Sequence, residues 1–445
     1  QNWGRTESAT PNRIERPTTE RELQSVVTDA RERGDTLRVV GSSHSFSPVV
    51  PTDDTLVSLS QYTGVVDIDP EAERVTVRAG TMLADLNETL AEHGLAMSNL
   101  GDIDRQTVAG ALATGTHGTG LDFGVLSSQA VGFRLVAADG EIVECTPDDE
   151  DLFRSAQVSL GALGVISEVT LDVEPAYDLC LRRRAVPVDE VLDNLDRFHG
   201  EHRNWEFFWF PHTDTALVKT FDRVPTGAKR RVESDGDGAL GGLLGDLDAW
   251  VENTAWESIC KLGSKYPATA PTGARLAAAT LSDKTEVGPS HEVFANPRDV
   301  RFRETEYSVP AGDLPAAVRD IRQHIEDNDV SVQFPIECRF VGADDPYLSP
   351  AHGRDSGLIA AHIYYQKSLP DYFDACEAIF DEYDGRPHWG KQHSKTAAEF
   401  ADRYPEWETF QEIRRRHDPE GLFLNDHLET VLAGSEQRVS AAADD

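Results

Sequence analysis

The stretch 107–120, "TVAGALATGTHGTG", consists of glycine, alanine and threonine apart from Val108, Leu112 and His117. Small residues let a backbone approach a ligand closely, and successive peptide N–H groups in glycine-rich turns form concavities that bind anions. A flexible surface loop would have a similar composition, but Val108, Ala111 and Leu112 have the apolar character of buried anchors. The composition therefore favours a cradle for a diphosphate group.

A second small-residue turn lies upstream, in "RVVGSSHSFSP" at 38–48. The segment "TLRVVG" reads as a strand that enters this turn, and His44 follows two serines within it. Taken alone, such a histidine is typical of a loop cap, because a single Gly–Ser turn is a weak motif. A role for His44 in chemistry needs support from the rest of the chain.

The elements around these loops indicate an α+β fold. Thr19 and Glu22 have the spacing of a capping box before a helix that Gly34 ends. A strand is expected at 73–80, a helix at 81–94, a hairpin around Asp139–Gly140 and a buried strand at 164–175. The expected elements do not alternate as β-α-β units, and no G-x-G-x-x-G motif stands at the start of a helix. Both observations argue against a Rossmann nucleotide site.

The amino-acid composition changes after Pro175. An aromatic segment follows at 204–211, "NWEFFWFP", and then a Gly- and Asp-rich insertion at 233–248. We predict four parts: a first domain at 1–175, a second domain at 176–390, a C-terminal segment at 391–433, and a frayed tail at 434–445.

Charge and cysteine content narrow the possible partners. The 445 residues carry a formal net charge of −36, which disfavours nucleic acid and anionic membrane surfaces as partners and suggests adaptation to high salt.

The chain has no apolar run of about 18 residues and no secretory signal pattern, so we expect no membrane span and a cytoplasmic location. The five scattered cysteines predict reduced, buried thiols and no metal site.

Five motifs in register carry a family resemblance: "GSSHS" (41–45), "TVAGALATGTHGTG" (107–120), "SLGALGVISEVTL" (159–171), "RPHWGK" (386–391) and "DPEGLFLN" (418–425). With them the chain resembles flavoproteins of the vanillyl-alcohol-oxidase type, in the branch of aldonolactone and alditol oxidases that includes gulonolactone dehydrogenases. The resemblance implies a two-domain protein, with an FAD-binding domain and a substrate domain that covers the flavin ring.

The same resemblance implies that His44 carries the FAD through a covalent bond to the 8α-methyl group. A neutral imidazole, with an ordinary pKa near 6.5, is a competent nucleophile for such a bond. The residues that the family would place along the diphosphate and ring are Val39, Val40, Gly41, Ser42, Ser43, His44, Ser45, Thr107, Gly110, Thr114, Gly115, Thr116 and His117, with Val165 at the adenine end.

Substrate chemistry is expected in the second domain. Glu337 and Arg339 are two residues apart in a strand-like stretch, so their side chains share one face, although an exposed surface pair would have the same spacing. The family places this pair over the flavin to bind sugar hydroxyls and an alkoxide oxygen. Lys391 matches an active-site lysine, and His362 is either a candidate base or a structural histidine.

The implied reaction is oxidation of a CH–OH group in a sugar lactone or polyol, with hydride transfer to the flavin. By alignment on "TVAG", Gly101 falls at the position that controls oxygen access in this branch, and Asp102 next to it is expected to face the substrate. A glycine leaves room for oxygen and favours an oxidase. The alternatives are a dehydrogenase that uses a quinone, a cytochrome or another acceptor, a nicotinamide-dependent flavin reductase, and a non-catalytic flavin-binding protein.

Overall fold

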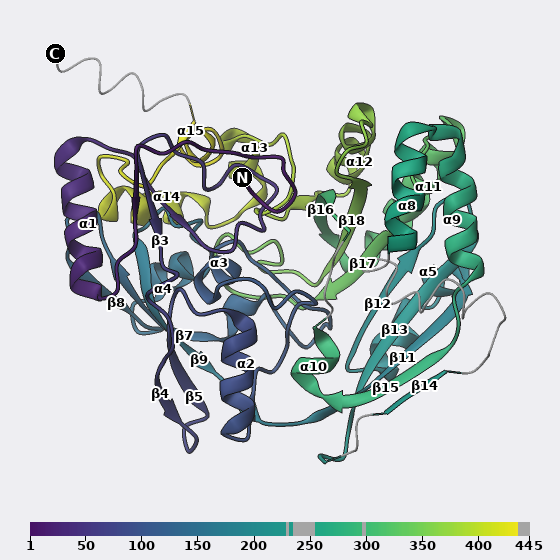
Figure 1. Cartoon of the computed structure of the whole chain (residues 1–445), viewed down its shortest axis with the longest axis horizontal. Coiled ribbons are helices and arrows are strands. Elements are labelled where there is room, and N and C mark those ends of the chain that lie inside the picture. The colour runs from purple at the N-terminus through teal and green to yellow at the C-terminus, as the bar shows by residue number, and fades with distance from the viewer. Residues whose placement is uncertain (228–230, 235–253, 296–299, 435–445) are drawn as a thin grey trace.

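The computed structural model describes residues 1–227, 231–234, 254–295 and 300–434, and it shows two halves side by side (Figure 1). The N-terminal half is built on two sheets, and the second half on one large antiparallel sheet. Positions 235–248 of the expected insertion and 435–445 of the expected tail lie outside the described residues.

The first half combines a parallel sheet of order β1-β3-β2 with an antiparallel sheet of order β4-β5-β9-β7-β8, and β6 pairs with β10. Its strands are β1 (Arg13–Glu15), β2 (Leu37–Val40), β3 (Thr55–Ser58), β4 (Val65–Asp69), β5 (Arg74–Arg78), β6 (Leu95–Ala96), β7 (Ala130–Val136), β8 (Ile142–Cys145), β9 (Val165–Asp172) and β10 (Glu174–Pro175). Its helices are α1 (Glu20–Arg33), α2 (Leu83–Glu92), α3 (Val108–Ala113) and α4 (Glu150–Gln157).

Local sequence signals explain these elements. The hydroxyl of Thr19 accepts a hydrogen bond from the Glu22 N–H at 3.2 Å, and Gly34 ends α1 in the left-handed conformation, as the sequence predicts. Strands β7 and β8 form the expected hairpin around Asp139–Gly140. Helix α2 ends at Glu92, two residues before the predicted stop at Gly94.

The second half contains, among the described residues, a nine-stranded sheet of order β14-β15-β11-β13-β12-β17-β18-β16-β19. Its strands are β11 (Asp178–Pro187), β12 (Asn204–Trp209), β13 (Thr215–Val224), β14 (Arg231–Ser234), β15 (Lys284–Pro289), β16 (Phe302–Pro310), β17 (Ile336–Val341), β18 (Ser356–Tyr364) and β19 (Arg386–Pro387). Its helices are α5 (Val188–Leu192), α6 (Leu195–Glu201), α8 (Thr254–Lys265), α9 (Ala270–Ala279), α10 (Ser290–Phe294), α11 (Leu314–Asp327) and α12 (Pro370–Glu382).

The two faces of this sheet have different chemistry. Apolar side chains of β17, such as Ile336, Cys338 and Phe340, pack in one core with residues of α11 and α12. Because side chains alternate along a strand, Glu337 and Arg339 point to the opposite face. That face is the one that meets the first half of the molecule.

The chain then returns to the first half through α13 (Ala397–Arg403), α14 (Trp407–His417) and α15 (Asp426–Leu428), drawn in yellow in Figure 1. The buried Arg38 guanidinium, at the entrance to the His44 turn, donates to the carbonyls of Phe423, Leu160 and Val49. Burial lowers the pKa of Arg38 to about 10. The C-terminal segment thus helps to fix the His44 turn.

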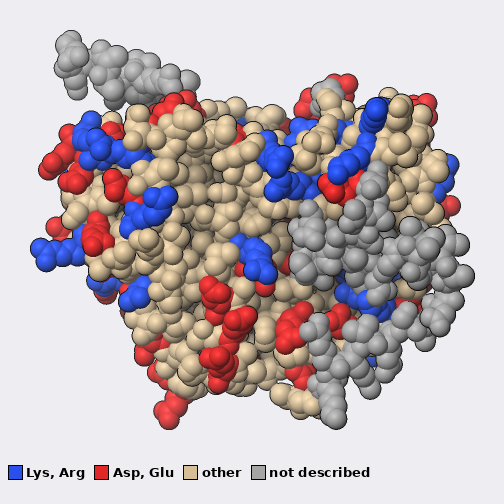
Figure 2. Space-filling model, viewed as in Figure 1, with Lys and Arg blue, Asp and Glu red and all other residues tan. Residues whose placement is uncertain are grey.

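The cysteine side chains agree with the expectation of reduced, buried thiols. All five cysteines lie in the described residues, and they are free and buried. Acidic and basic side chains are interspersed on the face shown in Figure 2. Among the described residues, no helix has the length and apolar character needed to cross a bilayer, and no group of three or more His, Cys, Asp or Glu side chains could hold a metal ion.

Candidate active site

Charged side chains form a band across five neighbouring strands, on the sheet face that meets the first half. We define the charged band as Lys219 on β13, Glu206 on β12, Glu337 and Arg339 on β17, His362 on β18, and Glu304 and Glu306 on β16. Strand register creates it, because Glu206 lies opposite Lys219 and Glu304 lies opposite His362. Side chains far apart in the sequence therefore meet on one surface.

Arg339 lies among three carboxylates at one end of the band. Its Nε donates to Oε2 of Glu206 at 2.8 Å, its Nη2 lies 2.7 Å from Oδ1 of Asp102, and it also pairs with Glu337. Burial alone would lower the pKa of Arg339, but the three carboxylates outweigh that effect and raise it. Glu206 in turn pairs with Lys219 at 3.1 Å.

Lys391 lies at the other end, between two carboxylates of β16. Its Nζ is 2.5 Å from Oε2 of Glu304 and 3.6 Å from Oε2 of Glu306. The other oxygen of Glu306 contacts Nε2 of His117 at 2.7 Å, and His117 belongs to the glycine-rich stretch of the first half. The contacts Glu306–His117 and Asp102–Arg339 therefore link the two halves.

The His44 turn lies beside the segment that carries Lys391. The N–H of Phe46 donates to the Gly390 carbonyl at 2.6 Å, and the Ser47 hydroxyl donates to the Trp389 carbonyl at 2.6 Å. Burial and the positive charge of Lys391 lower the pKa of His44, so its imidazole is neutral at pH 7. Such an imidazole has a lone pair available for bond formation.

The two loops predicted to hold the cofactor pack closely and leave backbone exposed. A Cβ at Gly41 would lie 2.4 Å from Oγ1 of Thr107, and one at Gly110 would lie 2.8 Å from the same atom. Gly41 and Gly110 are both exposed, and Ser43 has a left-handed φ of +58°. A side chain at Gly41 or Gly110 would collide with Thr107, so this exposed backbone stays bare, which suits a ligand that needs backbone contact, as the diphosphate of FAD does.

The other predicted cofactor residues lie in the same two loops or at strand ends. Gly115 is left-handed and packs against Pro350, and Thr116 accepts from Gln106 at 3.0 Å. Val165 begins β9 with its side chain in the core, so its role at the adenine end stays a prediction. The remaining predicted residues are placed as follows: Val39 and Val40 end β2, Ser42 and Ser45 flank His44, and Thr114 follows α3.

Exposure separates the site into an accessible and a buried layer. The side chains of Lys391, Asp102 and Arg339 retain 20%, 13% and 12% exposure. Glu304 and His362 retain only 4% and 2%. His362 Nδ1 lies 3.3 Å from the Pro335 carbonyl, and Nε2 lies 3.4 Å from Glu304 Oε1. A ligand entering at the junction meets the two cations and Asp102 first, while His362 lies beneath them.

Four members of this arrangement were absent from the sequence-based prediction: Glu206, Lys219, Glu304 and Glu306. A signal was present for Glu206 and Lys219, because each is a charged residue in a largely apolar strand segment, "NWEFFWF" and "ALVKTF". Glu304 and Glu306 also have the period-two spacing of one strand face. All four side chains are buried, so none of them is an ordinary solvent-exposed charge.

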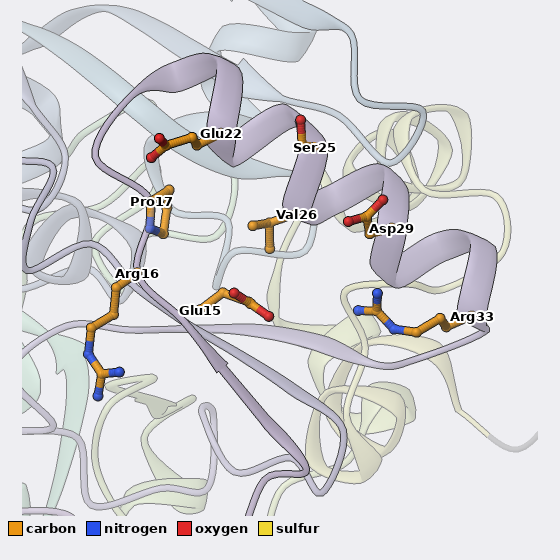
Figure 3. A pocket seen from close by; sticks show the side chains of 8 residues that line it. All are labelled: Glu15, Arg16, Pro17, Glu22, Ser25, Val26, Asp29 and Arg33. Atoms are coloured by element: carbon orange, nitrogen blue, oxygen red, sulfur yellow. The ribbon is translucent and has the colours of Figure 1, made fainter.

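A surface depression elsewhere does not share any residue with this site. It lies between the end of β1 and helix α1, and Figure 3 shows the residues that line it. Most of them are charged or polar, and Arg33 pairs with Asp35 on the surface. The charged band therefore remains the stronger candidate for chemistry.

Comparison with known proteins supports the cofactor and the fold. A family model described as an FAD binding domain matches residues 11–146. The structure is similar to cholesterol oxidase from Brevibacterium sterolicum, with a TM-score of 0.77, 16% identity and coverage of 94% of each chain. A solvent-stable cholesterol oxidase gives a TM-score of 0.74. The fold and site thus define a two-domain FAD-dependent oxidoreductase.

The sequence comparison is more specific. A model described as D-arabinono-1,4-lactone oxidase matches residues 169–431. The chain is 39% identical to an L-gulono-1,4-lactone dehydrogenase of Mycobacterium tuberculosis over 97% of this chain and 98% of the relative, and 33% identical to the L-gulonolactone oxidase of Mus musculus over the same shares. The chain belongs to the D-arabinono-1,4-lactone oxidase family. This membership confirms the predicted resemblance. It favours an enzyme over a non-catalytic flavin-binding protein.

Proposed function

We propose that this enzyme oxidises a CH–OH group of a sugar-derived aldonolactone, and that the charged band is its reaction site. The observation that carries the proposal is the convergence of Arg339, Lys391 and Asp102 at the junction of the halves, beside the His44 turn. Lactones named for the relatives, gulonolactone and arabinonolactone, are the first candidates. A polyol is the alternative substrate with the same reacting group.

The accessible side chains suit the charge changes of this reaction. The reaction removes a hydride and a proton from the CH–OH group, and FAD, when bound, supplies the acceptor for the hydride. Arg339 and Lys391 stabilise negative charge that develops on the substrate oxygen. Glu337 and Asp102 accept hydrogen bonds from neighbouring hydroxyls and so orient the sugar.

The hydroxyl proton needs an acceptor within the protein. Lys391 and His362 are the two candidates, and they differ in access: Lys391 is partly exposed, whereas His362 is buried beneath Glu304 and Glu337. His362 would receive the proton through one of these carboxylates rather than directly. The base is thus either a member of the charged band, His362, or the lysine that contacts its β16 carboxylates, Lys391.

His44 is the proposed point of covalent attachment for the flavin. The ring centroids of His44 and Trp3 lie 6.0 Å apart, with 29° between the ring planes. Trp3 would hold the imidazole in place, which suits His44 as the residue that would carry the cofactor.

Oxygen is the proposed electron acceptor, because Gly101 adds no side chain near the cradle. A dehydrogenase that uses another acceptor is the second candidate, and the relative from Mycobacterium tuberculosis bears that name. The two differ in how fast substrate-reduced enzyme returns to the oxidised state in air.

A substrate screen tests the proposal. The purified protein is mixed without air with gulono-, galactono- and arabinono-lactones, xylitol and an aldose, and the flavin absorbance near 450 nm is followed. We expect at least one lactone to bleach the flavin within seconds. Bleaching by dithionite but by none of the sugars would contradict the proposed substrate class, and rapid bleaching by NADPH would favour a reductase.

A further inference from the structure

Glu304 lies at the β16 end of the charged band and is almost fully buried, so it offers little surface to a substrate. It lies on β16 directly opposite His362 on β18, with 3% of the residue exposed. One carboxylate oxygen contacts Lys391 Nζ at 2.5 Å, and the other lies 3.4 Å from His362 Nε2. A single buried carboxylate therefore contacts both candidate proton acceptors.

The electrostatic surroundings of Glu304 explain its charge. Burial alone would raise the pKa of Glu304, but Lys391 and His362 outweigh it and lower the pKa to about 2. Glu306, two residues along the same strand face, adds a second negative charge 3.6 Å from Lys391. A buried carboxylate pair of this kind is costly unless a cation lies between the two groups.

Lys391 is the cation at that position. Its partners come from several elements: Glu304 and Glu306 from β16, and the Phe46 ring of the His44 turn at 5.4 Å from Nζ. His44 and His388 also lie close enough to feel its charge. The two carboxylates face the ammonium group from the buried side, so they favour its charged form over the neutral amine.

We propose that Glu304 is a positioning residue for the reaction, which holds Lys391 as an ammonium ion aimed at the junction of the halves. This inference rests on the proposed function. It gives Lys391 the role of stabilising developing negative charge, since a lysine held in its ammonium form is a poor proton acceptor. The proton then passes to the carboxylate–His362 layer beneath it.

The first test measures Lys391 directly and needs no substrate. Flavin-containing protein is treated with acetic anhydride across pH 7–11, and modification of Lys391 is read by peptide mass spectrometry. In Glu304→Gln, we expect the labelling midpoint of Lys391 to move to lower pH by about 1–2 units, because an opposite charge at this distance has been removed. Glu304→Asp should give a smaller shift, and it replaces Glu304→Gln if that variant does not fold.

A matched control is available in the same sheet. Glu286 on β15 lies 3.6 Å from the buried Arg183, and β15 is separated from β16 by five strands. Glu286→Gln removes the same charge without touching the charged band, so the Lys391 midpoint should stay at the wild-type value.

The second test uses the substrate found in the lactone screen. If Lys391 acts on the transition state, Glu304→Gln should lower kcat at least 10-fold with little change in KM, and the alkaline limb of the kcat–pH profile should move to lower pH. An unchanged Lys391 midpoint and an unchanged alkaline limb would overturn the role of Glu304. A wild-type enzyme that no lactone reduces would instead contradict the proposed function, and the labelling result would still decide the inference.

Discussion

Asp102 Oδ1 lies 2.7 Å from Arg339 Nη2, and this ion pair joins the cofactor half of the molecule to the sheet of the substrate half. Asp102 directly follows Gly101, at the start of the stretch that leads into the cradle, and Arg339 belongs to the charged band. The two halves are therefore linked by a partly buried ion pair. The arrangement agrees with a reaction that requires a sugar carbon to be held against the flavin.

The covalent link to FAD can be tested by denaturation. If His44 carries the flavin, the yellow colour should stay with wild-type protein after acid precipitation, whereas His44→Ala should release its FAD or fail to retain it. Absorbance of the pellet and the supernatant is the measurement. A yellow supernatant from the wild type would show that the flavin is not covalently bound.

We propose that oxygen access depends on the space at Gly101. A Cβ there would lie 3.0 Å from the His117 carbonyl oxygen and 3.7 Å from Thr116 Cγ2, so Gly101→Ala fits only after a small shift. We expect this variant to keep its rate of reduction by substrate but to react with oxygen at least 10-fold more slowly. Stopped-flow reoxidation with peroxide detection measures the second step. Equal reoxidation rates in both proteins would remove Gly101 from oxygen control.

Several local features of the fold could be predicted from the sequence because they depend on neighbouring residues. Thr19, Glu22 and Gly34 set the ends of α1 through capping and a left-handed turn, whatever lies around the helix. The shared face of Glu337 and Arg339 follows from strand periodicity alone.

The rest of the site depends on contacts that no local pattern encodes. Glu304 meets Lys391 because β16 lies next to the segment after β19, although the two residues are 87 positions apart. Glu206 reaches Arg339 because β12 pairs with β17. The order of strands in the nine-stranded sheet determines both contacts, and the sequence analysis did not predict that order.

Salt dependence follows from the net charge of −36. We propose that the protein is adapted to high salt, since 1 M salt shortens the screening length to about 3 Å and weakens repulsion among carboxylates. The melting temperature should therefore rise by several degrees between 0.1 and 2 M KCl. Sorbitol at equal osmolality is the control for non-ionic effects. An unchanged or lower melting temperature in KCl would contradict salt adaptation.

Acid lability is expected from three histidines with low pKa values, of which His388 is buried and His393 and His427 are partly buried. Burial is the main cause in each case, and the values are about 3 for His388 and about 4 for His393 and His427. The ordinary value in an unfolded chain is about 6.5, so the unfolded state binds these protons first. Stability should be complete above pH 6.5 and fall as the pH decreases toward 4. Urea unfolding across this range measures the loss, and His393→Gln should make it smaller.

The measurement that tests the account most directly is single-turnover flavin reduction without air, in wild-type protein and in Glu337→Gln, with the lactone that reduces the wild type. Glu337 is buried and pairs with Arg339, and the substitution keeps its shape while removing its charge. We expect Glu337→Gln to retain a normal flavin spectrum and to be reduced about 100-fold or more slowly, as is typical for loss of one preorganised polar group. Arg339→Ala should be slower still. Near-normal reduction in both variants, with the flavin intact, would show that the chemistry does not occur at the charged band.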